Sequence, residues 1–225
     1  MNCFLEDLNR LCARHVCVIV TENVPDSVAL AIDRLAFPVR VLGNSKVKGF
    51  GANHNAAFAH CTTPFYCVAN PDIRLERDPF PALRETLADF GTGVVGPLVR
   101  SPAGAIEDSA RRFPTFASLF QKLYRAPAGP DYAAEGNAIE VDWVAGMFML
   151  FRSDAYRAVG GFDERFFLYY EDVDICRRLR SRGFATVFHP GVSVIHDARR
   201  ASRRHPRLMA IHAASAMRYL TRNYR

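Results

Sequence analysis

Apolar positions along the first hundred residues alternate between a pattern typical of helices and one typical of buried strands. Residues 2–14 repeat apolar side chains at helical spacing, whereas residues 16–21 form a continuous apolar run that indicates a strand buried on both faces. By the same criteria we expect further strands at 39–42, 65–69 and 93–99, and helices at 27–37, 53–61 and 79–90. This alternation predicts an α/β fold, with a mostly parallel central sheet flanked by helices.

The second half of the chain is less regular. Residues 101–138 are rich in Pro, Gly and Arg, and we expect them to be largely irregular, with a helix near 116–124. Strands are predicted at 141–151, 186–188 and 192–195, and helices at 171–183 and 208–224. Neither a repeat nor a low-complexity linker divides the sequence. We therefore predict one domain over residues 1–205, followed by a basic helix over residues 206–225.

Composition and charge narrow the class of protein. The 225 residues are 49% hydrophobic and 23% charged, which suits a globular core and excludes wholesale disorder. No run approaches the roughly 18 apolar residues of a membrane span, and the N-terminus lacks a signal-peptide pattern, so a soluble cytoplasmic chain is expected. The six cysteines form no CxxC pair and predict buried, reduced thiols.

The net charge of +6 is concentrated at the C-terminus. Eight arginines lie in the last 27 residues: Arg199, Arg200, Arg203, Arg204, Arg207, Arg218, Arg222 and Arg225. Such a cluster suits a phosphate-bearing partner, such as a nucleotide, a lipid phosphate, a membrane surface or nucleic acid. A solvated helix face is the alternative, and charge alone does not choose between them. Because no nucleic-acid-binding motif is present, we expect no nucleic-acid partner.

Polar residues that follow predicted strands are candidates for ligand binding, because open α/β sheets bind ligands beyond the carboxyl ends of their strands. The strand at 65–69 runs into Asn70-Pro71-Asp72, where one carboxylate can hold a divalent cation if a diphosphate supplies further oxygens. A simple turn is the competing interpretation. His196 ends the last strand as a metal ligand or a structural residue, and Asp197 is expected to orient its ring.

Two further segments carry candidate chemistry. Within residues 161–174, four aromatic residues at 166–170 directly precede the acids Glu171, Asp172 and Asp174 in a first helical turn. Helix capping explains the acids but not the aromatics, and an ionised carboxylate walled by rings is a candidate general base. Residues 44–55 are glycine-rich but match neither dinucleotide-binding nor P-loop patterns. Lys46 or Lys48 there is placed to meet phosphate, and a solvated turn is equally compatible.

Four stretches taken in order carry a resemblance to a known family. They read GFGANHNAAF at 49–58, NPDIRL at 70–75, DWVAGMFMLFR at 142–152 and GGFDERFFLYYEDVDICRRLRSRG at 160–183. Together they resemble the family 2 inverting glycosyltransferases with a GT-A fold, especially the rhamnosyltransferase-like members. The resemblance spans about residues 15–205. It implies metal-dependent sugar transfer from a nucleotide-diphosphate donor with inversion at the sugar carbon.

Site roles follow from this resemblance position by position. Asp72 and His196 would bind Mn²⁺ or Mg²⁺, and Asp172 would take the proton from the acceptor hydroxyl. The implied donor-binding residues are Glu22, Asn44, Lys48, Asn70 and Asp72, and the implied acceptor-binding residues are Asp142, Trp143 and Glu171. From charge and position alone, Arg111, Arg112 or the arginines at 199–204 are further candidates to meet the diphosphate.

The resemblance also indicates the expected partners, and the sequence departs from the family's usual pattern in two places. The donor is dTDP-rhamnose or a UDP-sugar, and the acceptor is a saccharide or a lipid-linked sugar, with the basic C-terminus at the membrane surface. Residues 16–23 match the second strand of such enzymes, so we expect the usual first strand to be lacking. Val47 stands where an Asn is usual. Two other hypotheses are therefore retained: a partner-dependent or inactive relative with an incomplete donor pocket, and a basic nucleic-acid-binding domain.

Overall fold

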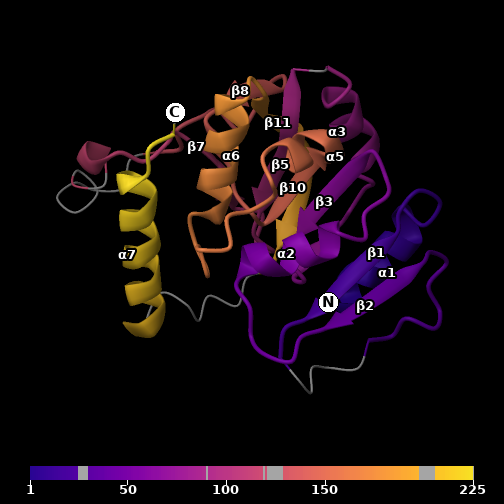
Figure 1. Cartoon of the computed structure of the whole chain (residues 1–225). Helices are drawn as coiled ribbons and strands as arrows, with labels where there is room; N and C mark the ends of the chain where they lie inside the picture. The colour runs from indigo at the N-terminus through magenta and orange to yellow at the C-terminus, as the bar shows by residue number, and fades with distance from the viewer. Residues whose placement is uncertain (25–29, 90, 119, 121–128, 198–205, 225) are drawn as a thin grey trace.

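The computed structural model describes residues 1–24, 30–89, 91–118, 120, 129–197 and 206–224 (Figure 1). The helices among them are α1 (Asn2–Leu11), α2 (Phe50–Phe58), α3 (Phe80–Thr86), α5 (Ser153–Ala158), α6 (Glu171–Ser181) and α7 (Pro206–Thr221). The strands are β1 (Val18–Glu22), β2 (Val39–Gly43), β3 (Phe65–Ala69), β4 (Ile73–Arg74), β5 (Thr92–Arg100), β6 (Ile106–Glu107), β7 (Ala110–Arg111), β8 (Ile139–Val141), β9 (Trp143–Val144), β10 (Phe148–Arg152) and β11 (Ala185–His196).

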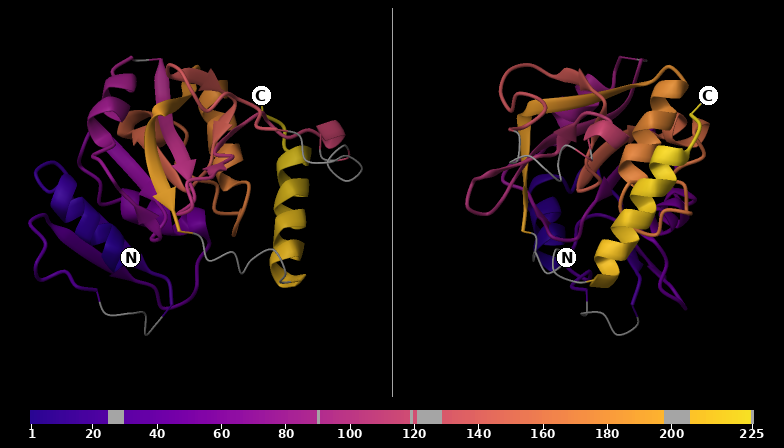
Figure 2. Two further views of the ribbon diagram at one scale, coloured as in Figure 1. Left: turned by 180° about the vertical axis from the view of Figure 1, so that it is seen from behind. Right: turned by 90° about the vertical axis from the view of Figure 1, so that its left-hand side faces the viewer.

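The main sheet has seven strands. Its path is β3-β10-β5-β11-β4, with β6 paired to β5 and β8 paired to β11. β5 and β11 are parallel, and β10 runs antiparallel between β3 and β5, so β3, β5 and β11 point the same way. Helices lie against this sheet in Figures 1 and 2, which confirms the expected α/β class with a flanked central sheet.

The first two strands stand apart from that sheet. β1 and β2 pair in parallel as a separate two-stranded sheet, next to α1 and on the far side of the molecule from α7 (Figure 2). β3 is an edge strand of the main sheet. Among the described residues, β1 and β3 therefore belong to different sheets.

Alternation along β5 divides the core into two clusters. Val94 and Leu98 face one cluster, which takes in the buried side of α6, and Val95 and Val99 face the other, which includes α1 and α3. Both sides of this nine-residue strand are covered, which explains why its sequence is continuously apolar rather than alternating. The strand ends that leave these clusters carry the polar residues described below.

The sequence-based element predictions need three corrections. Residues 30–37 are not helical, because the backbone N–H groups of Ala31 and Ala36 donate to the side chains of Asn2 and Asn9 on α1 instead of to a helical ladder. The remainder of the predicted 27–37 helix lies outside the described residues. The predicted strand at 141–151 is divided between β8, β9 and β10, and the strands at 186–188 and 192–195 are one strand, β11, with a register shift after His189. Of the predicted 116–124 helix, residues 116–118 and 120 are helical and the others lie outside the described residues.

Candidate active site

The carboxyl ends of β3 and β11 bring three predicted site residues together. His196 Nε2 lies 3.4 Å from Asp72 Oδ1 and 3.3 Å from Asn70 Nδ2. The backbone supports this arrangement, since the N–H of Asp197 donates to the carbonyl of Asp72 at 3.0 Å. Asp72 Oδ1 is buried and accepts no hydrogen bond from the described residues. A buried carboxylate oxygen next to an imidazole nitrogen is a donor set that a divalent cation would satisfy.

A residue missed by the sequence analysis orients His196. Glu107 Oε2 lies 3.0 Å from His196 Nδ1, so a proton on Nδ1 leaves the lone pair of Nε2 directed at Asp72 and Asn70. We expected Asp197 to perform this task from the adjacent position. Glu107 stands 89 residues earlier, on the short strand β6, and only the pairing of β6 with β5 brings it close. Contact with Asp72, and more weakly with Glu107, raises the pKa of His196 despite its burial.

The second group of acids lies at the start of α6. Asp172 is half-buried, and its Oδ2 accepts a hydrogen bond from the N–H of Gly146 at 3.0 Å while its Oδ1 accepts from Val173 at 2.8 Å. Burial raises the pKa of Asp172, against those hydrogen bonds and the charge of Arg111. Glu171 is only 6% exposed, and its Oε2 has no partner among the described residues. Burial, reinforced by Asp172, raises the pKa of Glu171 to about 8. Burial therefore favours the protonated form of Glu171 at neutral pH.

One short segment connects the two groups of acids. Gly146 donates to Asp172, and the carbonyl of the next residue, Met147, accepts from the N–H of Asn70 at 3.0 Å. The entry to β10 thus fixes the Asp72 side and the Asp172 side relative to one another. A Cβ at Gly146 would meet only ordinary contacts, the nearest being the Phe50 ring at 3.5 Å.

The aromatic segment ahead of Asp172 is held in an unusual backbone conformation. Tyr169 and Tyr170 have φ of 70° and 68°, which non-glycine residues rarely adopt. Gly49 packs against this segment so closely that a Cβ there would lie 2.6 Å from the carbonyl oxygen of Phe167. The N–H of Phe50 donates to the same oxygen at 2.9 Å. The start of α2 therefore supports the segment that leads into the candidate base.

Comparison with known proteins decides the family. Residues 7–215 match the family described as "Glycosyltransferase like family 2". The chain belongs to this family. It is 30% identical to the N-acetylglucosaminyl-diphospho-decaprenol L-rhamnosyltransferase of Mycobacterium tuberculosis (strain ATCC 25618 / H37Rv), over 90% of this chain and 73% of the relative. It is also 30% identical to rhamnosyltransferase WbbL of Escherichia coli (strain K12), over 78% of this chain and 71% of that protein.

A solved structure supports the fold assignment. The mannosyltransferase PcManGT from Pyrobaculum calidifontis, in complex with GDP-Man and Mn²⁺, matches with a TM-score of 0.63 and 16% identity, over 95% of this chain and 59% of that one. The expected GT-A architecture is therefore confirmed, and the chain is a glycosyltransferase.

In this glycosyltransferase the GFGANHNAAF stretch holds the Gly-Gly-Phe segment in place through the side chain of Asn55. Asn55 Nδ2 donates to the carbonyl of Phe162 at 2.9 Å and to Glu164 at 3.0 Å. Asn55 Oδ1 accepts from the N–H of Phe162 at 2.9 Å and from the Tyr156 hydroxyl at 2.8 Å. One side chain on α2 thus makes four hydrogen bonds to the Gly-Gly-Phe segment and its surroundings. These bonds give Asn55 a structural role that requires no phosphate ligand.

The C-terminal helix of the glycosyltransferase also contacts the aromatic segment. The ring of His212 on α7 lies 5.1 Å from that of Tyr169 and 5.4 Å from that of Tyr170, and Ser215 donates to the carbonyl of Leu168 at 2.9 Å. Arg222 forms ion pairs of 2.7 Å with Asp163 and 2.6 Å with Asp174. The charge of Arg222 is therefore already paired with two carboxylates of the fold. Arg199, Arg200, Arg203, Arg204 and Arg225 lie outside the described residues.

The predicted acceptor residues Asp142 and Trp143 both contact the segment at 110–113. Asp142 accepts from the N–H of Phe113 at 2.8 Å and from Arg180 at 2.6 Å. Trp143 Nε1 donates to the carbonyl of Arg112 at 2.9 Å. The guanidinium of the neighbouring Arg111 lies 5.8 Å from the Trp143 ring, and its charge opposes the burial that raises the pKa of Asp172. The structure therefore gives Asp142 and Trp143 partners in the fold and adds Arg111 to the base side of the site.

The predicted donor residues at the ends of β1 and β2 form a separate asparagine network. Asn44 Nδ2 donates to Asn23 at 3.0 Å and to Asn53 at 2.7 Å. Lys48 is exposed, and its backbone N–H and carbonyl both bond to the Asn23 side chain at 2.9 Å. The carbonyl of Glu22 accepts from the N–H of Asn44 at 3.0 Å. In the part of the chain that the structure describes, neither Asn44 nor Lys48 contacts Asp72 through a hydrogen bond or ion pair.

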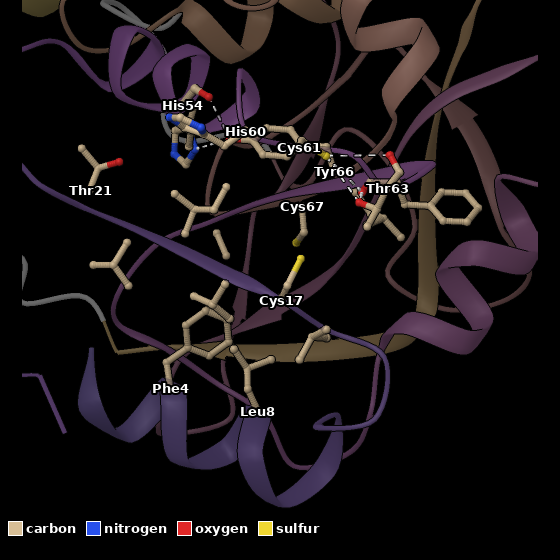
Figure 3. A pocket seen from close by; sticks show the side chains of 18 of the residues that line it. Phe4, Leu8, Cys17, Thr21, His54, His60, Cys61, Thr63, Tyr66 and Cys67 are labelled. Atoms are coloured by element: carbon tan, nitrogen blue, oxygen red, sulfur yellow. Dashed lines mark hydrogen bonds between the residues drawn. The ribbon is translucent and has the colours of Figure 1, made fainter. Parts of the chain in front are cut away.

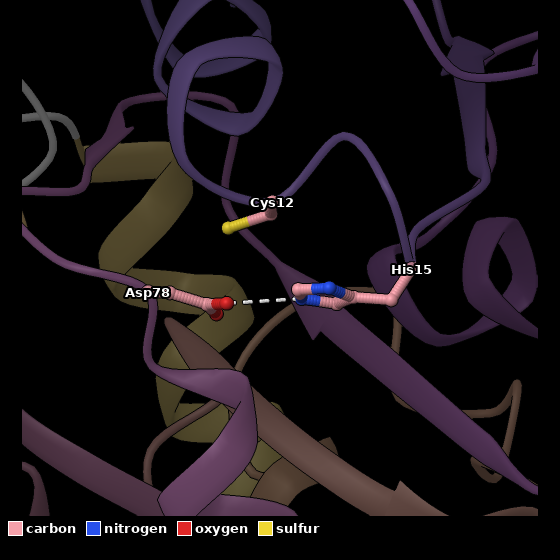
Figure 4. A group of neighbouring side chains, drawn as sticks. All are labelled: Cys12, His15 and Asp78. Carbon is pink, nitrogen blue, oxygen red and sulfur yellow. Dashed lines mark ion pairs between the residues drawn. The ribbon is translucent and has the colours of Figure 1, made fainter.

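A third cluster, formed by Cys12, His15 and Asp78, lies away from the strand ends (Figure 4). The Cys12 sulfur, a ring nitrogen of His15 and a carboxylate oxygen of Asp78 all lie within 4.8 Å of one another. His15 Nε2 is 3.0 Å from Asp78, and burial raises the pKa of the Cys12 thiol to about 12. The ion pair joins the end of α1 to the loop before α3. All six cysteines are free, although Cys3 and Cys17 are exposed rather than buried as expected.

Proposed function

We propose that this glycosyltransferase transfers a sugar from a nucleotide-diphosphate donor to a hydroxyl of a lipid-linked saccharide, with a divalent metal and with inversion. Both curated relatives described above are named rhamnosyltransferases, and one is named for an acceptor linked through diphosphate to decaprenol. These names favour a rhamnosyl donor such as dTDP-rhamnose over a UDP-sugar. The single observation that carries the proposal is the placement of two different carboxylate groups, at Asp72 and Asp172, on either side of the Gly146–Met147 segment.

Asp72 and His196 are the residues that would hold the metal. The buried Oδ1 of Asp72 lacks a hydrogen-bond donor, and His196 Nε2 lies 3.4 Å away with its ring fixed by Glu107. A bound Mn²⁺ or Mg²⁺ would neutralise the charge that develops on the leaving diphosphate. Asn70 Nδ2 lies 3.3 Å from the same imidazole nitrogen, so Asn70 borders the proposed metal position.

Asp172 is the proposed general base. Two backbone N–H groups fix its carboxylate, and burial raises its pKa, which increases its basicity while the N–H groups favour the ionised form. Glu171 retains its own proton, so that the two adjacent acids do not both carry charge. Asp172 then accepts the proton of the acceptor hydroxyl as that oxygen attacks the sugar carbon, which leads to inversion.

Three variants test these assignments. Asp172→Asn is expected to lower turnover by roughly 10²- to 10⁴-fold, because it removes the base while keeping the shape of the side chain. Asp72→Asn is expected to abolish the Mn²⁺-dependent thermal stabilisation by dTDP or UDP. Asp33→Asn, a change of the same kind at an exposed residue, should leave both unchanged.

Each result can contradict the proposal. Transfer from dTDP-[¹⁴C]rhamnose at the wild-type rate by Asp172→Asn would remove Asp172 as the base. The same nucleotide-dependent shift in Asp72→Asn as in the wild type would remove Asp72 as a metal ligand. If the wild type shows no metal-dependent shift with dTDP, UDP, GDP or CDP, the alternative of a partner-dependent protein with an incomplete donor pocket is favoured.

We further propose that the outer face of α7 contacts an anionic membrane leaflet, where a lipid-linked acceptor resides. Met209 and Met217 are 62% and 53% exposed, and Arg207 is exposed on the same helix. No helix among the described residues is long and apolar enough to cross a membrane. Sedimentation with phosphatidylglycerol vesicles should exceed that with phosphatidylcholine vesicles. Equal binding to both would contradict the electrostatic part of this proposal.

A further inference from the structure

Three side chains of different chemistry converge between the end of α1 and the start of α3. The Cys12 sulfur, a ring nitrogen of His15 and a carboxylate oxygen of Asp78 lie within 4.8 Å of one another. Figure 4 shows Cys12 and His15 approaching the Asp78 carboxylate from two sides. An ion pair between His15 and Asp78 requires only two of these groups. The sulfur beside them turns the pair into a set of three donors that metal ions bind in proteins.

A tight turn after α1 brings Cys12 and His15 together. The N–H of Cys12 still donates to the carbonyl of Leu8 at 2.8 Å, which ties this residue to the last turn of the helix. The N–H of His15 then donates to the carbonyl of Cys12 at 3.1 Å. The two side chains are thus separated by two residues of a hydrogen-bonded turn, a ligand spacing that is common in zinc sites.

The start of α3 orients Asp78. Its Oδ1 accepts a hydrogen bond from the N–H of Phe80 at 3.0 Å, and its Oδ2 lies 3.0 Å from His15 Nε2. Phe80 also supports the imidazole, because the two rings meet edge to face with their centroids 6.1 Å apart. One carboxylate oxygen is therefore held by the backbone while the other is presented to the cluster, which is the kind of support that fixes metal-ligating carboxylates.

Burial and neighbouring groups define how a metal would be coordinated here. Cys12 is only 1% exposed, whereas His15 is exposed, so an ion reaches the cluster from the imidazole side. Asp7 on the same helix already accepts hydrogen bonds from two arginines and a backbone N–H. Within the described part of the chain, the cluster holds three His, Cys, Asp or Glu donors. A bound metal would therefore have three protein ligands and one position for water.

We propose that Cys12, His15 and Asp78 bind Zn²⁺. A thiolate and an imidazole favour Zn²⁺ over Mn²⁺ and Mg²⁺, which prefer sites rich in oxygen ligands. On binding, the Cys12 thiol releases its proton to solvent, and a sulfur–zinc bond replaces the S–H bond. The ion then joins the end of α1 to the loop before α3, in place of the direct ion pair. The proposal does not rest on the proposed catalytic function.

Cobalt provides a direct readout, because a thiolate bound to Co²⁺ produces a sulfur-to-metal charge-transfer band that nitrogen and oxygen ligands do not produce. The reduced full chain is titrated with Co²⁺ under anaerobic conditions, and Zn²⁺ or Mn²⁺ is then added as a competitor. Other thiols require a control, since Cys17 and Cys67 approach one another across a cavity of about 630 Å³ (Figure 3). Cys17→Ser tests that pair, and Cys3→Ser is the matched change at an exposed cysteine of α1.

We expect the wild type to show the band at a single equivalent of Co²⁺ and to lose it with equimolar Zn²⁺ but not with excess Mn²⁺. Cys12→Ser should lack the band. His15→Ala and Asp78→Asn leave the buried sulfur in place and should weaken Co²⁺ binding at least about tenfold, since loss of even an outer-shell partner of a metal has an effect of that size. Because His15 is exposed, His15→Ala tests the site without altering the core.

Four results would overturn the proposal. They are the absence of the band in the wild type, a band of wild-type strength in Cys12→Ser, unchanged Co²⁺ affinity in His15→Ala, and loss of the band in Cys17→Ser, which would assign the sulfur to the cavity. Asp72→Asn removes the proposed catalytic metal ligand and should retain the band. Its failure to bind Mn²⁺ with an intact cobalt band would separate the two sites, and loss of the band would contradict a separate zinc site.

Discussion

Glu171→Gln isolates the consequence of placing two acids side by side at the start of α6. Glu171 is buried next to Asp172, and its pKa is raised from 4.5 to about 8. In the unfolded chain the side chain ionises near pH 4.5, whereas in the folded protein it keeps its proton until about pH 8. Ionisation of the unfolded state alone favours unfolding, so this residue makes the protein less stable as the pH rises through that window. A glutamine cannot ionise and removes this effect.

The size of the effect follows from the two pKa values. A pKa rise from 4.5 to about 8 corresponds to an upper limit of about 5 kcal/mol at pH above 8. Most of it develops between pH 5 and pH 8, where the stability gap between Glu171→Gln and the wild type should widen by about 3 kcal/mol as an upper limit. With a urea m-value of roughly 2–3 kcal/mol/M for a chain of this size, the midpoint difference should grow by about 1 M.

Urea unfolding followed by circular dichroism at pH 5, 6, 7 and 8 measures this gap. Glu85→Gln, a change of the same kind at an exposed position on α3, supplies the baseline and should follow the wild type at every pH. A Glu171→Gln midpoint that differs from the wild type by the same amount at pH 5 and pH 8 would refute the buried, protonated state of Glu171. It would also remove the reason for assigning the negative charge to Asp172.

Two other substitutions and the removal of metal should also have measurable effects on this protein. Asn55→Ala removes four hydrogen bonds that hold the Gly-Gly-Phe segment and should lower the free energy of unfolding by about 2–4 kcal/mol in urea, while Asn137→Ala, at an exposed position, should change it by less than about 0.5 kcal/mol. Gly49→Ala brings a Cβ to 2.6 Å from the Phe167 carbonyl and should lower the thermal midpoint by several degrees, unlike Gly43→Ala, where nothing lies within 4 Å. Treatment with EDTA should abolish sugar transfer and Mn²⁺ should restore it, whereas transfer that survives chelation would contradict the metal-dependent proposal.

Much of the fold was accessible from the sequence because local patterns agree with it. The continuous apolar runs at 16–21, 65–69 and 93–99 correspond to β1, β3 and β5, and the acids that open the helix at residue 171 lie in the first turn of α6. Where tertiary contacts compete with local preference, the predictions were wrong. Residues 30–37 have helix-compatible spacing, yet the side chains of Asn2 and Asn9 accept hydrogen bonds from the backbone N–H groups at positions 31 and 36, and the segment forms turns instead.

The sequence by itself determined the family and the order of the candidate chemistry, because Asp72, Asp172 and His196 lie in motifs that are local in the chain. Tertiary structure decided which of these residues meet and what surrounds them. Glu107 contacts His196 from 89 residues away, and Gly146 contacts Asp172 across 26 residues. The placement of β1 and β3 in different sheets is likewise a property of strand pairing. Pairing joins segments that are distant in sequence, and hydrophobic periodicity encodes which face a residue presents but not which strand lies beside it.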